Sequence, residues 1–545
     1  MIYQRGQQKD YNTWQELSGS DGWGWDDMST YFDKSLDYDL SLANGTENGI
    51  SFENDATDWN NVQGGEWHVE KQRLSWAVLD DFRQACEDSN IPIRAHFNSS
   101  DQEGCGYFQV NQKSGFRLSS HGAFLKPILH RENITVETNQ HVEKITIEKE
   151  EGDTNSKPRA TGIVLTDTKS GTTRTVHAHQ EIILSAGAVG SPHILQCSGV
   201  GNPKTLQQYN IPKPSTTTNK GELEMEDYVA LEGVGENLQD HLQIRSVYKL
   251  KDDTLTLNSW KKAGSLIGQA MMGLEYAMFQ TGELSMAPSQ FGLFANSERS
   301  GGTPDLQFHI QPLSLDDLSN PQSMHDFPGK VVHIKANSIV FISSFLFDCF
   351  LYTSTPFQIN THNSSTNFFY QLIFFYLYIT FTHVVLGLTT SVCNLRPTSR
   401  GSVTPSGSTT LDAPNIDPNY LDTEHDQLVA ADALRLARRL VLDSKSFKEK
   451  YTPSEHFPGL HIETDEELAR EAGNISTSIF HPVGTCKMGR LDDASAVVDD
   501  QLRVIGVNGL RVVDASIMPT IVSGNTNSPV IAIAEKASSM ILNSR

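Results

Sequence analysis

The sequence predicts a mixed α/β fold, with α+β elements, in two closely packed domains. Its 545 residues exceed what one hydrophobic core normally organises. Short β-branched segments separated by polar turns fill residues 134–178, which is typical of a sheet. An apolar run then leads into a turn of small residues and a helix start at residues 181–192, which is typical of an α/β unit.

Local patterns predict the elements in detail. Helices are expected at Asp26–Ser35, Ser119–Leu129 and Thr423–Leu442. The last begins with a capping-box-like pair, Thr423 and Asp426, and its apolar face carries Val429, Ala433, Leu436, Ala437 and Leu440. The expected strands are Ile134–Thr138, Val142–Glu148, Thr161–Leu165, Arg174–Ala178 and a buried Glu181–Ser185. Residues 401–422 are expected to be strand and loop.

Composition and charge exclude several classes of partner and site. Hydrophobic residues make up 38% and charged residues 20% of the chain, as in ordinary globular proteins. The net charge of −23 predicts repulsion from nucleic acid and anionic membranes. No CxxC pair occurs, which argues against a zinc site, and the closely spaced His177 and His179 fit an exposed edge strand better than a metal site. The GxSxG, HExxH and Walker motifs are also absent from the sequence.

The segment from Val331 to Leu395 departs from this composition, because Lys335 and Asp348 are its only charged residues. Residues 368–388 are long and apolar enough for a transmembrane helix, but polar residues dilute them and no basic cluster flanks them. We favour the interpretation that residues 330–387 are a translated retained intron. Sequences resembling translated splice sites bound it, namely Gly329-Lys330-Val331 and Leu386-Gly387.

Three motifs suggest chemistry. In the first, the turn Ser185–Gly190 follows a strand, with Ser191 as the expected N-cap and Pro192 as the first helical residue. Small residues there let a ligand approach the backbone, and a helix N-terminus favours anionic groups, although a plain packing turn looks the same. The other two motifs are His481–Gly489 and Leu510–Pro529. Alone, a histidine is more often structural, and Asn-Thr-Asn-Ser-Pro is more often a turn.

In this order, the three motifs closely resemble those of the glucose–methanol–choline (GMC) oxidoreductase family. The resemblance covers nearly the whole chain outside residues 330–387 and 214–230. Further similar segments are Met1–Gly6, Gly22–Asp27, Val234–His241 and Arg396–Gly401. Within the family, Gly104–Gln112 and Phe480–Cys486 are most similar to choline-dehydrogenase-like alcohol dehydrogenases.

The resemblance implies an FAD-binding Rossmann-like domain interleaved with a substrate domain built on an antiparallel sheet. The FAD-binding part would comprise residues 1–245, and its C-terminal part, with the catalytic residues, 471–545. Residues 246–329 and 388–470 would form the substrate domain, interrupted by the insertion at 330–387. Because the family opens with a strand–GxGxxG–helix unit that this sequence lacks, we expect the first βαβ unit to be missing and Met1 to be an internal methionine.

The resemblance also implies the site residues. His481 would be the base that takes the alcohol proton, since imidazole titrates near operating pH, and Asn525 would donate a hydrogen bond to the developing alkoxide. Nine residues would lie against FAD: Val142, Ser185, Ala186, Gly187, Asp514, Ala515, Asn525, Thr526 and Asn527. No metal is expected.

The expected reaction is hydride transfer from a primary alcohol, choline-like or aliphatic, to flavin N5. A quinone or another carrier is expected as electron acceptor rather than oxygen. Two alternatives stay open, a sugar-oxidising GMC dehydrogenase and an inactive, truncated product that cannot hold FAD. A membrane-anchored protein requires residues 368–388 to be a transmembrane segment.

Overall fold

The computed structural model describes the chain from residue 1 to 544, apart from several gaps. The described ranges are 1–38, 46–47, 50–51, 62–98, 102–148, 157–214, 228–251, 254, 256, 266–286, 289–314, 334–335 and 387–544. Almost all of residues 330–387, with the predicted insertion and the candidate transmembrane segment, lies outside them. Within the described part, no helix has the length and apolar character needed to cross a bilayer.

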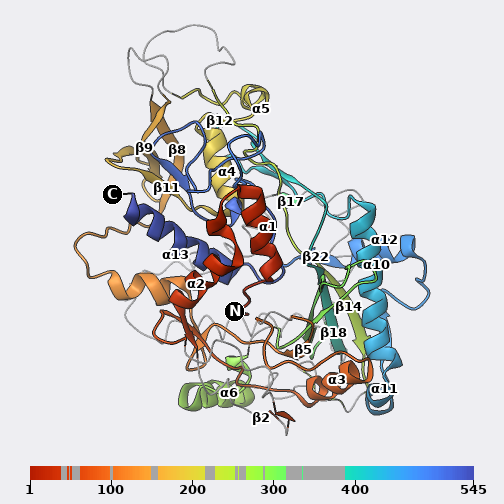
Figure 1. Ribbon diagram of the computed structural model, residues 1–545. Coiled ribbons are helices and arrows are strands. Elements are labelled where there is room, and N and C mark those ends of the chain that lie inside the picture. Colours follow the sequence, from red (N-terminus) through yellow and green to blue (C-terminus); the bar gives the residue numbers. More distant parts are fainter. Residues whose placement is uncertain are drawn as a thin grey trace.

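The largest sheet among the described residues is antiparallel and has seven strands. Its strands are β21 (Ser454–Phe457), β14 (Leu242–Lys249), β18 (Gly387–Asn394), β16 (Leu306–Gln311), β15 (Phe291–Ala295) and β5 (Gly104–Tyr107), with β22 (Ser476–Ser478) also pairing β14. Four helices pack beside it, α3 (Ala77–Asp88), α10 (Glu424–Arg438), α11 (Lys445–Tyr451) and α12 (Asp465–Asn474), as Figure 1 shows on the right. Together they enclose the first hydrophobic core.

Strand β16 separates this core from the functional side of the sheet. Leu306, Phe308 and Ile310 point into the first core, because alternate side chains of a strand lie on one face. Gln307 and His309 alternate with them and are also buried, so they face the opposite side. Two polar side chains buried on one face of a strand indicate a site there.

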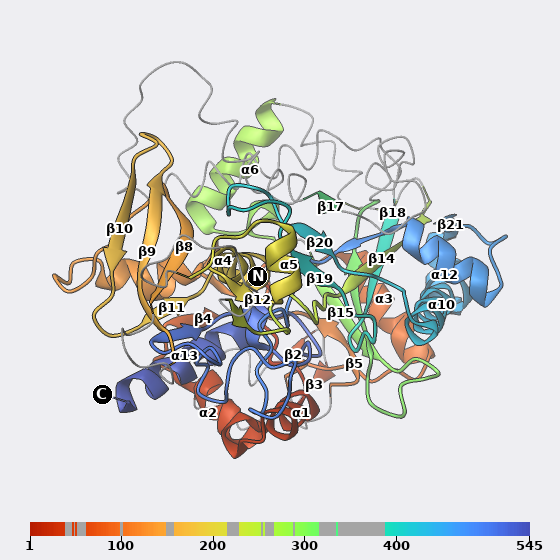
Figure 2. The same cartoon turned by 90° about the horizontal axis from the view of Figure 1, so that it is seen from above.

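A second core lies around the other motifs. It joins α1 (Gln8–Ser18), α2 (Trp25–Ser35), α4 (Gly187–Cys197), α13 (Asn527–Asn543) and the antiparallel strands β8 (Gln140–Glu148) and β9 (Arg159–Asp167). Strand β10 (Thr173–His177) continues this sheet beyond β9 but is exposed along its whole length. Strand β11 (Ile182–Leu184) pairs in parallel with β23 (Leu510–Val512). Figures 1 and 2 place α13 beside α2, so the two ends of the described chain pack together.

The remaining described elements are short, apart from the 14-residue helix α6. They are η1 (Asp21–Trp23), β1 (Leu36–Tyr38), β2 (Thr46–Glu47), β3 (Ile50–Ser51), β4 (Trp67–Val69), β6 (Gln112–Lys113), β7 (Phe116–Arg117), η5 (His121–Leu125), η6 (Lys126–Ile128), β12 (Val200–Gly201), α5 (Pro203–Gln208), β13 (Val229–Ala230), α6 (Leu266–Phe279), η8 (Glu283–Ser285), β17 (Ile334–Lys335), β19 (Ser402–Thr404), β20 (Asn415–Asp417), η10 (Arg439–Asp443) and η11 (Ala515–Ile517).

The structure confirms several expected elements. Helix α10 begins after Thr423, whose side chain accepts a hydrogen bond from the Asp426 backbone at 3.3 Å, and its predicted apolar face is buried. The Asp426 carboxylate does not return to the cap but binds Thr398 and Ser399 instead. The described cysteines carry free thiols.

Two predicted strands need correction. Residues 134–138 form no strand and are largely exposed, since no neighbouring segment pairs with them in the described part of the chain. Strand β11 is not fully buried, because Ile183 is 46% exposed; the described residues provide only β23 as its partner.

The start of α4 also differs from the prediction. The helix begins at Gly187, so Ser191 and Pro192 lie inside it. Pro192 cannot donate to the carbonyl of Ala188, four residues earlier. The Thr485 hydroxyl donates to that carbonyl at 2.6 Å instead, so a contact from a distant loop makes the internal proline tolerable.

Candidate active site

The parallel strands β11 and β23 bring two of the motifs together. Leu184 pairs with Val512, so both strands end at the same edge. The turn Ser185–Gly187 and Asp514 follow these ends directly. The carboxyl edge of parallel strands is where α/β proteins bind ligands.

Asp514 connects the residues that follow β11 and β23 through hydrogen bonds to both of its carboxylate oxygens. Its Oδ2 accepts hydrogen bonds from the Gly187 backbone N–H at 2.9 Å and from the Ser191 hydroxyl. Its Oδ1 accepts from the backbone N–H of Ser516 at 2.8 Å and from the Ser516 hydroxyl. The Ser191 oxygen also accepts from the Ala186 N–H at 3.0 Å, so Ser191 organises the start of α4 from within the helix.

The turn itself is open toward solvent. Ser185 and Ala186 are exposed, and Gly187 has a φ of +80° with no atom within 4 Å of where a Cβ would stand. A side chain would fill this space, and the positive φ disfavours one. The turn can therefore accept a ligand against its backbone.

His481 is positioned by a loop that leads to it from β22. The preceding residue, Phe480, has a φ of +65°, which is strained for a bulky side chain. The His481 backbone N–H donates to Asp240 at 2.8 Å, and the Ser478 and Tyr420 hydroxyls donate to the same carboxylate. Burial raises the pKa of Asp240, while these donors oppose that shift.

The His481 ring contacts two side chains from distant parts of the chain. Its Nδ1 lies 3.1 Å from Nδ1 of His241, and its Nε2 lies 3.1 Å from Nδ2 of Asn525. The Asn525 Oδ1 accepts from Nε2 of Gln307 at 3.2 Å. The loop after β22, the loop before α13 and the polar face of β16 therefore meet at one point.

The histidines of this cluster are held neutral. Burial, followed by the charges of His241, His309 and the Met1 amino group, holds the pKa of His481 well below 6.5. Burial also lowers the pKa of His241 to about 4. Burial, the charge of His241 and the Met1 amino group lower that of His309 to about 3. A neutral imidazole can accept a proton, as a general base requires.

Several buried polar atoms of this region lack a hydrogen-bond partner among the described residues. They are both ring nitrogens of His309, Oε1 of Gln307, both amide atoms of Gln4 and Oγ of Ser528. Gln4 lies beside Gly524, and Ser528 is in the first turn of α13. Buried polar groups are normally satisfied, so these atoms fit a site that receives a polar ligand.

The remaining expected residues lie around this cluster. Thr526 is the buried N-cap of α13 and Asn527 its exposed first residue, while Ala515 begins η11. Val142 lies on β8, packed against the second core, and its carbonyl accepts from Thr410 at 2.9 Å. No described hydrogen bond joins Val142 to the other expected site residues.

Four residues of the cluster were not predicted from the sequence to have a role. His241 and Asp240 end the Val234–His241 segment, and Gln307 and His309 lie on β16. The alternation of Gln307 and His309 with apolar residues was a signal that could have identified the last two.

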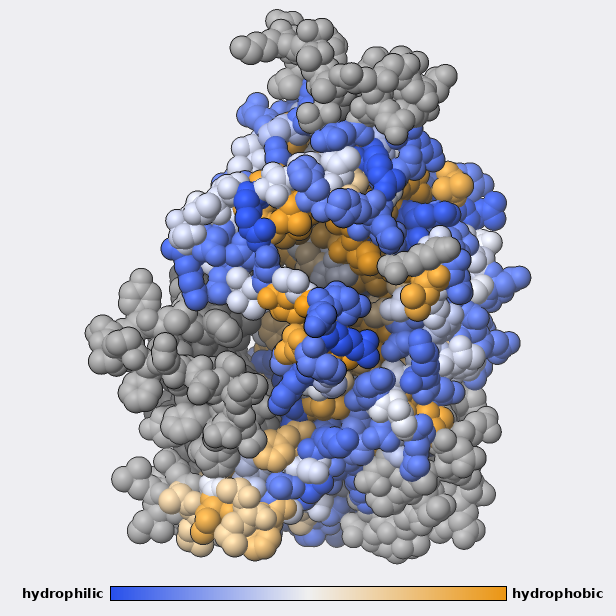
Figure 3. Space-filling model, turned by 90° about the vertical axis from the view of Figure 1, so that its left-hand side faces the viewer, coloured by the Kyte–Doolittle hydropathy of each residue, from blue (hydrophilic) through white to orange (hydrophobic). Residues whose placement is uncertain are grey.

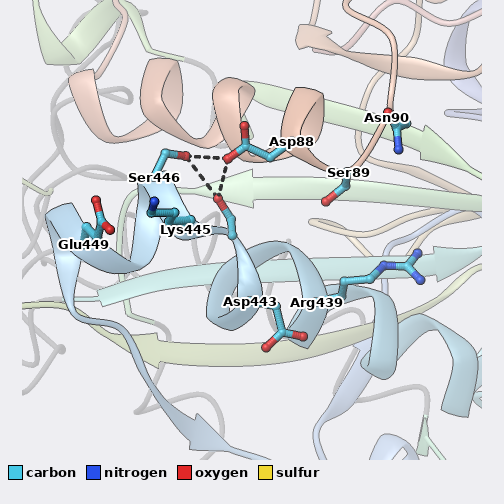
Figure 4. Close-up of a pocket in the computed structure, with 9 residues that line it drawn as sticks. Asp88, Ser89, Asn90, Arg439, Asp443, Lys445, Ser446 and Glu449 are labelled. Carbon is cyan, nitrogen blue, oxygen red and sulfur yellow. Dashed lines mark hydrogen bonds between the residues drawn. The ribbon is translucent and has the colours of Figure 1, made fainter.

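Two surface features lie apart from this cluster. A polar cavity of about 890 Å³ lies between the end of α3 and the start of α11, where Asp88 accepts from Ser446 at 2.8 Å (Figure 4). None of the site residues described above lines it. Figure 3 shows another face, hollowed at its centre and bordered by hydrophobic residues. The apolar patch at its lower edge is α6, where Met271, Leu274, Met278 and Phe279 are exposed.

Comparison with known proteins shows the family of this chain. The N-terminal domain of GMC oxidoreductases matches residues 1–243, and the C-terminal domain matches residues 397–534. Choline dehydrogenase of mouse mitochondria is 30% identical over 99% of this chain and 73% of its own length. The chain belongs to the GMC oxidoreductase family. Its cofactor is FAD, which the open turn, the N-terminus of α13 and the unpartnered polar atoms fit.

Other GMC relatives and solved structures extend the comparison. An alcohol dehydrogenase [acceptor] of Pseudomonas putida is 29% identical over 99% of this chain and 79% of its own length. Pyridoxine 4-oxidase from Mesorbium loti superposes with a TM-score of 0.69 at 23% identity, covering 100% of this chain and 82% of that one. A fungal aryl-alcohol oxidase gives 0.71 at 20% identity, covering 100% and 84%. At these identities, the two structures show the fold alone.

Proposed function

We propose that this GMC oxidoreductase oxidises a primary alcohol, either choline or an aliphatic alcohol. FAD supplies the hydride acceptor, at its N5 atom, when it is bound. The observation that carries the proposal is the pairing of His481 Nε2 with Asn525 Nδ2 at 3.1 Å in a buried site of neutral histidines. The relatives named choline dehydrogenase and alcohol dehydrogenase [acceptor] support the choice of substrate class.

His481 and Asn525 have different roles toward the alcohol oxygen at this site. His481 accepts the hydroxyl proton at Nε2, because a neutral imidazole offers a lone pair there. Asn525 donates its Nδ2 hydrogen to the same oxygen, and this bond strengthens as negative charge develops. Because the two nitrogens are 3.1 Å apart, a hydroxyl oxygen can reach both once Asn525 turns from His481 to the substrate.

The residues proposed to face the cofactor lie on the turn after β11, just after β23 and at the start of α13. Ser185, Ala186 and Gly187 offer backbone and open space, and Asp514 fixes that turn through the Gly187 N–H. Ala515 follows Asp514, and Thr526 and Asn527 present the N-terminus of α13. Val142 is assigned to the adenine side. In domain terms, residues 1–245 and 471–545 surround the cofactor, and residues 246–329 with 388–470 provide the substrate sheet. A quinone or another carrier is the proposed electron acceptor.

A substrate panel tests this function. The full chain, loaded with FAD, is offered choline, an aliphatic primary alcohol and glucose, each with a quinone or with oxygen as acceptor. We expect kcat/KM to be highest for choline or the aliphatic alcohol, with the quinone. Preferential oxidation of glucose would replace the proposed substrate by a sugar, and an inert, fully flavin-loaded protein would contradict the proposal.

The depressed pKa of His481 sets a pH dependence. Only the neutral imidazole can accept a proton, so the single-turnover rate of alcohol oxidation should fall as pH drops through the pKa of His481. Since burial holds that pKa well below 6.5, we expect a constant rate from pH 8 to below 6.5 and a decline only in more acidic buffer. A decline centred at pH 6.5 or above would contradict the assignment.

Acid unfolding must be separated from this titration. The unfolded chain binds protons at its histidines near pH 6.5, whereas folded His241 and His309 do not until about pH 4 and 3. Stability is therefore expected to fall as the pH drops below 6.5. Urea unfolding at each pH shows over which range the rate reports the folded protein.

A further inference from the structure

We propose that His241 is a positioning residue, which holds His481 in the tautomer that carries its proton on Nδ1 and leaves Nε2 bare. The proposal rests on the proposed function, in which His481 is the base. Its physical basis is a chain of hydrogen bonds whose direction is fixed at one end by a backbone carbonyl.

The fixed end is the carbonyl oxygen of Leu395, which lies 3.3 Å from Nε2 of His241. A carbonyl oxygen can only accept, so Nε2 of His241 must carry the hydrogen. In a neutral imidazole the other nitrogen is then an acceptor, and Nδ1 of His241 offers a lone pair. Burial keeps His241 neutral, because it lowers the pKa to about 4.

The hydrogen bond between the two histidines then determines the tautomer of the base, His481. Nδ1 of His241 lies 3.1 Å from Nδ1 of His481, and two bare nitrogens cannot bond, so the hydrogen must be on Nδ1 of His481. The two rings meet nearly edge to face, at 82° with centroids 5.3 Å apart. Nε2 of neutral His481 is consequently bare, and it faces the Nδ2 hydrogen of Asn525.

The far end of the chain agrees with this direction. With Nδ2 of Asn525 donating to His481, its Oδ1 is free to accept, and Nε2 of Gln307 donates to it at 3.2 Å. In the opposite tautomer, His241 would place a lone pair against the Leu395 carbonyl, which is repulsive in a buried site. The Asn525 and Gln307 amides would also both have to turn over, so the Leu395 carbonyl is the group that fixes the direction.

Sheet pairing holds His241 and Leu395 near each other. His241 directly precedes β14 and Leu395 directly follows β18, two paired strands in which Gln243 lies opposite Cys393. The carbonyl that sets the direction therefore belongs to the residue at the end of the strand next to β14. The other titratable groups that act on His481 are His309 and the Met1 amino group, and neither has a hydrogen bond to its ring in the described part of the chain.

Two amide substitutions of similar polarity at position 241 distinguish a positioning role of His241 from a purely structural one. In His241→Asn, the Oδ1 atom can take the place of Nδ1 and accept from His481. In His241→Gln, the amide N–H can take the place of Nε2 and still donate to Leu395, but no acceptor faces His481. We expect His241→Gln to slow single-turnover alcohol oxidation by about 10–100-fold, the factor that one misdirected buried hydrogen bond corresponds to. KM should change little, and His241→Asn should recover most of the rate.

The proton position itself is the second readout. Full-length, FAD-loaded protein with ¹⁵N-labelled histidine side chains is compared by NMR with the His481→Ala variant, which identifies the His481 signals. We expect a protonated Nδ1 and a bare Nε2 in the natural protein and in His241→Asn, and a mixture of tautomers in His241→Gln. A protonated Nε2 in the natural protein, or an unchanged tautomer and rate in His241→Gln, would overturn the proposal.

Two controls separate this inference from the proposed function. His130 is exposed on the surface, so His130→Asn should change neither readout. If His481→Ala does not slow oxidation, the assignment of the base fails, whatever the tautomer. If His481→Ala slows oxidation and His241→Gln does not, only the positioning role of His241 fails.

Discussion

Replacing His481 by alanine is expected to reduce turnover with a primary alcohol by roughly 10²–10⁴-fold, the usual contribution of general acid–base catalysis. No other described side chain is placed to take up the proton where Nε2 of His481 does. His241 contacts the opposite ring nitrogen of His481, Nδ1, and so lies on the far side of the ring from that position. Asn525 can donate but cannot take up a proton at neutral pH. The rate should be measured in a single turnover, so that product release does not mask the loss.

The cofactor should stay bound in the same variant. His481 makes no described contact with the turn at Ser185–Gly187, and its backbone N–H still donates to Asp240. The flavin absorbance per chain and the urea midpoint should therefore remain close to those of the natural protein. His130→Ala, at an exposed position, is the matched control. Turnover within a few-fold of the natural protein would exclude His481 as the base.

The sequence was most informative where a pattern is local. The apolar face and cap of α10 predict the helix because i, i+3 and i+4 positions share one face, and the structure confirms both. The motif Leu510–Pro529, which contains Asp514, could likewise be recognised from the sequence. The pattern of small residues did not predict that α4 begins at Gly187. The contacts that allow Pro192 inside the helix come from Thr485 and Asp514, which are distant in the sequence.

The chain of hydrogen bonds proposed to set the tautomer of His481 could not be predicted from the sequence for the same reason. His241 and His481 are far apart in the chain, and their 3.1 Å contact depends on the register of β14, which follows His241, against β22, which precedes His481. Register is a property of two strands together, so neither segment reveals it alone. Residues 134–178 illustrate the same limit: β8 and β9 formed as expected because they pair with each other, whereas the similar run at 134–138 found no partner in the described part.

Replacing Asp514 by alanine is expected to release the flavin and to destabilise the fold by about 3 kcal/mol or more. Hydrogen bonds to a charged group contribute about 1.5–3 kcal/mol each, and this buried carboxylate accepts from Gly187, Ser191 and Ser516. Without it, the Gly187 N–H and the Ser516 N–H lose their acceptor, and the open turn loses its link to β23. The backbone that should lie against the cofactor would then no longer be fixed.

Asp514→Asn separates the two effects, because it keeps the shape but offers one acceptor oxygen in place of two. We expect it to fall between the natural protein and Asp514→Ala in both flavin content, read from the visible absorbance per chain, and urea midpoint. Asp422→Asn, at an exposed position, should change neither. If Asp514→Ala lowers the urea midpoint yet keeps one flavin per chain, the carboxylate supports the fold but does not hold the cofactor edge. If neither quantity changes, the network around Asp514 has no role in forming the site.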